Sequence, residues 1–88
     1  MEKLKILKAD LQIINTSNDD YLNFLLESSK GNMKRAGIQE EDTLEYSLAN
    51  VHYAAYLFRK RGSNDTAIPE YLRIELRRLK MSQNLKKD

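Results

Sequence analysis

Few side chains in this sequence are of the types that carry out catalysis or bind metal ions. It contains one histidine, His52, and no cysteine. Its clustered acids, Asp19 with Asp20 and the run at 40–42, stand where helices are expected to begin, and acidic side chains are favourable there as caps. A metal site needs several converging ligands, which these residues do not supply. The sequence therefore predicts no catalytic residue and no metal site.

Motifs for covalent catalysis and for phosphate binding are also missing. No Ser or Thr stands in a recognised nucleophile motif, so His52 has no partner to activate. The glycines Gly31, Gly37 and Gly62 are isolated from one another and form neither a P-loop nor a dinucleotide fingerprint. We expect a non-enzymatic protein without a cofactor, in which His52 is a packing or surface residue.

Basic residues gather in the last third of the chain. Residues 1–57 carry six Lys or Arg against nine Asp or Glu, whereas residues 58–88 carry nine against four. A solvated face, a protein interface and a phosphate contact all remain open for this region. The basic candidates for such contacts are Arg59, Lys60, Arg61, Arg73, Arg77, Arg78 and Lys80.

Three tyrosines, Tyr46, Tyr53 and Tyr56, fall within one expected helix. Aromatic residues at helical spacing are more often core and interface residues than a platform for stacking bases. We therefore take them as candidate packing or subunit-interface residues.

The apolar spacing predicts an all-α fold, a small bundle of three main helices and a short N-terminal helix. The short helix is expected at about residues 3–11, and the second runs from near Asp19 to near Ala36, where Gly37 closes it. For the third, Asp42 and Glu45 have the spacing of a capping box. Its inward stripe is expected to be Leu44, Leu48, Val51, Ala55 and Phe58.

The last helix is expected to open at Ile68 and Pro69, because proline is favoured in the first turn of a helix. Its expected inward residues are Ile68, Leu72, Leu76 and Leu79. Beyond residue 80 the periodicity fades. We expect one helical domain over residues 1–80 and a polar tail over residues 81–88.

The composition is that of a small globular protein, with 41% hydrophobic and 32% charged residues. The absence of cysteine fits a reducing compartment. No apolar run has the length of a membrane span, and the first residues interleave charged with apolar side chains, unlike a signal peptide. We expect a protein of the cytoplasm with no membrane partner.

The order of these features resembles the head-tail connector family, also called head completion or adaptor proteins, of tailed bacteriophages and prophages. The resemblance covers about residues 3–80. The first similar segment, at 4–20, is an opening helix followed by an apolar pair and an Asn/Asp-rich turn. The other three are the helical segments DYLNFLLESSK at 20–30 and SLANVHYAAYLFR at 47–59, and the proline-containing start of the last helix, IPEYL at 68–72. The connection between the second and third helices is shorter here than in many members.

The resemblance implies a structural role in virion assembly. Members form a homo-oligomeric, dodecameric ring that binds the portal protein, extends the DNA channel and holds the stopper or tail-completion protein. It implies location at the head-tail interface of the virion and, during assembly, in the cytoplasm of the bacterial host. It also implies that the basic candidates Arg59, Lys60, Arg61, Arg73, Arg77, Arg78 and Lys80 face the channel or the portal, and contact with packaged DNA there would be independent of sequence.

A small helical DNA-binding regulator is the alternative, because the last third of the chain is basic. A helix-turn-helix requires a turn of about three or four residues between its helices. The expected connections at 38–41 and 62–67 do not suit it, since the first is acidic and the second is longer.

Overall fold

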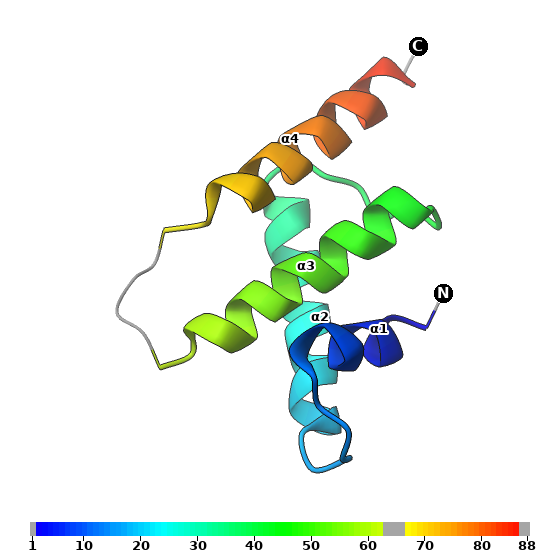
Figure 1. Cartoon of the computed structure of the whole chain (residues 1–88). Coiled ribbons are helices and arrows are strands. Elements are labelled where there is room, and N and C mark those ends of the chain that lie inside the picture. Colours follow the sequence, from blue (N-terminus) through cyan, green and yellow to red (C-terminus); the bar gives the residue numbers. More distant parts are fainter. Residues whose placement is uncertain (1, 63–66, 87–88) are drawn as a thin grey trace.

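Four helices make up the described part of the chain (Figure 1). The structure is a computed structural model that describes residues 2–62 and 67–86. Within these ranges there is no strand, and the elements are α1 (Lys3–Leu11), α2 (Asp19–Arg35), α3 (Leu44–Lys60) and α4 (Glu70–Leu85). The expected all-α fold with a short first helix is confirmed.

Local signals place the helix ends close to their expected positions. Gly37 has a φ of 91° just after α2, a left-handed conformation that glycine adopts without strain. The expected cap of α3 is wrong by one residue: the Thr43 side chain, not Asp42, accepts a hydrogen bond from the Tyr46 backbone N–H at 3.2 Å. Pro69 is extended and immediately precedes α4, rather than forming its first turn.

Helix α3 is the centre of the fold, because α1, α2 and α4 all pack against it. Its two sides contribute to two apolar clusters. One cluster joins the tyrosine side of α3 to Met33 of α2 and to Leu72 and Leu79 of α4. The other joins Val51, Ala54 and Ala55 to α1 and α2. Because other helices cover α3 on several sides, nine of its residues are buried.

The expected inward stripe of α3 is partly wrong. Leu44 is 59% exposed, and Leu48 and Phe58 are only half-buried, although Val51 and Ala55 are buried as expected. The periodicity allowed either of two neighbouring faces. Which residues of α3 are buried depends on the helices that pack on its opposite sides. These helices cover the tyrosines more completely than the leucines.

One buried polar side chain ties the first three helices together. Asn50 is fully buried in α3. Its amide nitrogen donates to the Leu26 carbonyl oxygen at 3.0 Å, and its Oδ1 accepts from Lys3 Nζ at 2.9 Å. Both polar ends of the amide are therefore satisfied, as a buried amide requires.

Helix α4 continues to Leu85, beyond the expected boundary at residue 80. Gln83, only 5% exposed, holds this extension in place. Its Oε1 accepts from the Gln39 N–H at 2.8 Å, and its Nε2 donates to the Gln39 carbonyl oxygen at 2.7 Å. Much of the predicted tail is therefore helical, while residues 87 and 88 lie outside the described residues. None of the helices within residues 2–62 and 67–86 is both long and apolar enough to cross a membrane.

Candidate functional site

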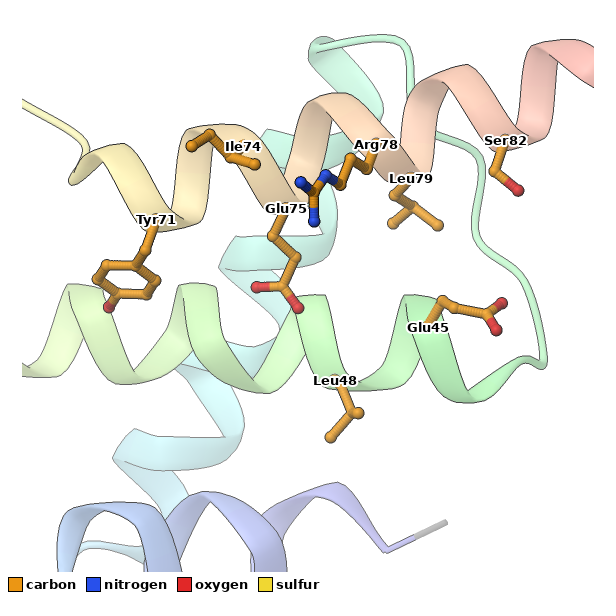
Figure 2. A pocket seen from close by; sticks show the side chains of 8 residues that line it. All are labelled: Glu45, Leu48, Tyr71, Ile74, Glu75, Arg78, Leu79 and Ser82. Atoms are coloured by element: carbon orange, nitrogen blue, oxygen red, sulfur yellow. The ribbon is translucent and has the colours of Figure 1, made fainter.

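A groove of about 510 Å³ lies between α3 and α4 (Figure 2). Tyr71, Glu75 and Leu79 extend from α4 toward α3, and Glu45 and Leu48 of α3 complete the lining. The lining mixes apolar side chains with the charges of Glu45, Glu75 and Arg78, a mixture that is found in protein-binding surfaces. The full lining consists of Glu45, Leu48, Tyr71, Ile74, Glu75, Arg78, Leu79 and Ser82.

The groove continues onto the outer face of α4. We call the residues Tyr71, Ile74, Arg78, Met81 and Leu85 the α4 outer stripe. Its four apolar members are exposed by 55%, 36%, 58% and 82% in chain order. The core side of the helix is formed separately, with Leu72, Leu79 and Gln83 buried. Helix α4 therefore has apolar residues on two sides, and the described residues cover one of them.

Two polar contacts between side chains of different helices lie near the groove. His52 Nδ1 of α3 lies 2.8 Å from Glu75 Oε1 of α4, which makes His52 a positioning residue between helices. Arg59 Nη2 lies 3.1 Å from Asp10 Oδ2 of α1. These side chains and Tyr71 line a second, more polar hollow of about 530 Å³. The pairs are partly exposed, so each contributes little to stability.

The structure separates the basic candidates into two groups. The end of α3 has contacts within the chain: Arg59 pairs with Asp10, Lys60 Nζ lies 5.2 Å from the Tyr56 ring centroid, and Arg61 lies 3.7 Å from that of Phe58. The α4 candidates are all exposed; they are Arg73, Arg77, Arg78 and Lys80. Arg59 and Arg61 are exposed too, so the groups differ in these contacts rather than in exposure.

The candidate tyrosines lie inside the fold. Tyr46, Tyr53 and Tyr56 are 1%, 8% and 7% exposed and belong to one cluster. Burial raises the pKa of Tyr46 and of Tyr53 above the usual tyrosine value of 10.0. The Tyr56 hydroxyl donates to the Ala67 carbonyl oxygen at 3.1 Å, which attaches the chain just before α4 to α3. Their packing role is therefore what the geometry supports.

A second exposed apolar surface lies on α2 and was missed in the sequence. Phe24 is 63% exposed and Tyr21 is 40% exposed. The Tyr21 ring is stacked with Phe24 at 6.5 Å between centroids and tilted against Phe58 at 6.2 Å. We call Tyr21, Phe24 and Phe58 the aromatic patch. The sequence feature that indicates this patch is the pair Tyr21 and Phe24, which lies outside the buried leucine stripe of α2.

Neither surface carries an arrangement for chemistry. Among the described residues, no three His, Cys, Asp or Glu side chains are grouped so that they could hold a metal ion. His52 is held by a carboxylate, but no hydroxyl or thiol nucleophile is bonded to it in the pairs that the structure gives. The geometry offers two apolar surfaces and an exposed set of positive charges, which are means of binding.

No protein-family model, no curated protein and no solved structure matches the chain. The function proposed below therefore rests on the chain's own residues and on the resemblance described above.

Proposed function

We propose that the chain is a non-enzymatic structural subunit of a tailed-phage or prophage head-tail connector. In this proposal identical copies form a ring under the portal, extend the DNA channel and link the head to the stopper or tail. The order of helices and turns in the sequence supplies the connector part of the proposal. The observation that supports a packing function is the uncovered α4 outer stripe, since exposed apolar surface of this kind marks protein interaction sites.

The size of the protein fits this role. A core shared by four short helices supplies only modest stability, roughly 3–5 kcal/mol in proteins of this size. Burial of the α4 outer stripe against another protein would remove four exposed apolar side chains from water. The exposed α4 basic residues suit either an acidic protein surface or sequence-independent proximity to DNA.

Light scattering after size exclusion, together with a pull-down on assembled portal rings of the same phage, tests the proposal. We expect the chain to be retained by portal rings and released when Leu85→Asp places a charge on the α4 outer stripe. Glu2→Asp, an exposed change outside this stripe, is the matched control. A wild-type chain that stays monomeric at high concentration and also ignores portal rings would contradict the proposal.

A small DNA-binding regulator is the second candidate, favoured by the exposed Arg73, Arg77 and Lys80 on one side of α4. The helices are joined by residues 12–18, 36–43 and 61–69, each longer than a helix-turn-helix turn. A salt-dependent gel shift comparing specific with random duplexes separates the two candidates. Binding without any sequence preference at low salt would eliminate the regulator.

A further inference from the structure

Helix α4 carries a seam for pairing with another helix. Residues 71, 74, 78, 81 and 85 of the α4 outer stripe follow one another at spacings of three and four, the pattern by which paired helices interlock. At 1.5 Å per residue the stripe is about 21 Å long. Tyr71 borders the groove beside α3, but the described residues leave all four apolar members of the stripe at least 36% exposed.

The α4 outer stripe is poorly suited to pairing with itself. Arg78 stands in its middle, so two copies placed centre to centre would bring two guanidinium groups together. Arg77 and Lys80 add positive charge beside the seam, and Glu75 already pairs with His52 at 2.8 Å. The other acid of α4, Glu70, lies in its first turn, eight residues before Arg78. Like charges at such a contact are destabilising. The complementary surface should be apolar and acidic.

Helix α2 offers a surface of that kind. Its buried side holds Leu22, Leu25, Leu26, Ser29 and Met33. The opposite side presents Asp20, Phe24, Glu27 and Gly31 at spacings of four, three and four. We call these four residues the α2 outer stripe. Phe24, 63% exposed, lies between two acids, of which Glu27 also pairs with Lys30 at 3.1 Å and Asp20 is exposed. The acidic part of the stripe is therefore its first half, since Arg35 Nη1 lies 3.8 Å from where a Cβ of Gly31 would stand.

We infer that copies of this chain join head to tail, with the α4 outer stripe of one copy seated on the α2 outer stripe of the next. When the middle of one stripe is placed on the middle of the other, Arg78 of one copy lies over the Phe24 ring of the next, between Asp20 and Glu27. Ile74 and Met81 then lie on either side of this contact. A guanidinium over an aromatic face with flanking carboxylates is favourable in charge and in stacking.

This pairing rests on the proposed function, since it names the contact between neighbouring subunits of the ring. The two stripes are different surfaces on different helices, so the contact is heterologous. Heterologous contacts generate closed rings when the rotation closes and filaments when it does not. The polarity of the chain, acidic in its first part and basic in its last, is what such a contact requires.

Two blocked variants test the inference. Phe24→Asp blocks the α2 outer stripe, and Met81→Asp blocks the α4 outer stripe; both positions are exposed, so each variant should retain the wild-type helical signal. In sedimentation at high concentration each variant alone should lose association by about tenfold or more. An equimolar mixture should restore a one-to-one heterodimer, because one intact surface of each kind remains. Lys5→Asp, on the exposed side of α1, is the control and should associate as the wild type does.

A disulfide trap makes the test independent of affinity, because the natural chain contains no cysteine. Ser28→Cys is mixed with Ile74→Cys or with Met81→Cys under mild oxidation. We expect a cross-link in one of the two mixtures, and the mixture that links gives the orientation of the helices. Preferential linking of Ser28→Cys to itself, equal linking in every mixture including controls, or no link at all would overturn the inference.

The outcomes for the inference and for the proposed function are distinguishable. A heterodimer and a specific cross-link without portal binding would support the head-to-tail contact and contradict the connector role. Portal binding by a chain that gives neither the heterodimer nor the cross-link would retain the connector role and overturn this contact. Association of Phe24→Asp alone into a dimer would show that α4 pairs with itself, which also overturns it.

Discussion

Replacing Gln83 by leucine should loosen the last turns of α4 without disturbing the rest of the fold. Leucine keeps the bulk of the buried side chain but removes both hydrogen bonds to the backbone of Gln39, at 2.8 and 2.7 Å. Each neutral bond contributes about 1 kcal/mol net. Gln39 is exposed, so water can replace its partner. The expected loss is therefore about 1–2 kcal/mol rather than a full desolvation penalty.

Thermal and urea unfolding followed by circular dichroism measure this loss. For a chain of this length about 1 kcal/mol corresponds to a fall in Tm of roughly 4–8 °C. Hydrogen exchange should show faster exchange of the Gln39 amide in Gln83→Leu. Gln39→Ala is the matched control, because the bonds use only the backbone of that residue. The reasoning is refuted if Gln83→Leu is as stable as the wild type, or if Gln39→Ala is destabilised equally.

Three further predictions concern the cap, the core and the response to alkali. Thr43→Ala should lower the free energy of unfolding by about 1 kcal/mol through loss of the α3 cap, whereas Asp42→Ala should change it little. Leu22→Ala should cost about 2–5 kcal/mol in urea unfolding, because Leu22 is fully buried. The free energy of unfolding should fall as pH rises above 10.0, since the buried Tyr46 and Tyr53 keep their protons in the folded state and lose them in the unfolded state.

Each of these predictions has a result that would contradict it. Equal losses in the two cap variants would mean that Thr43 is not the cap. A loss below about 1 kcal/mol for Leu22→Ala would mean that the core closes over the cavity. Lys3, whose pKa burial lowers, acts against the two tyrosines at alkaline pH. A stability that is constant up to pH 11, or that rises, would show that the tyrosines are not the dominant groups.

The existence and order of the helices could be predicted because their signals are local. The Asn/Asp-rich turn before α2, Gly37 after it and Pro69 before α4 act within a few residues of where they stand. Which face of α3 is buried could not be predicted in full. That depends on α1, α2 and α4 lying on different sides of it, which is a property of the tertiary arrangement.

The candidate surfaces were predicted less well than the helices. The basic residues of α4 and of the end of α3 were predicted together, but the pairing of Arg59 with Asp10 was not predicted. That pair joins residues 49 positions apart, which no local pattern reveals. The extension of α4 was missed for the same reason, because the partner of Gln83 is the backbone of Gln39. By contrast, the spacing of the α4 outer stripe was present in the sequence.

The central position of α3 also has a consequence for the order of folding. The principal helix contacts join α3 to its sequence neighbours α2 and α4, and α1 to α2 and α3. Contacts between neighbouring helices cost little loop-closure entropy, whereas the contact of α1 with α3 joins residues as far as 49 positions apart. During synthesis α1, α2 and α3 can pack together before α4 is complete, and we expect α4 to dock last. Amino-acid changes on the α4 side of α3 should therefore alter the unfolding rate more than the folding rate.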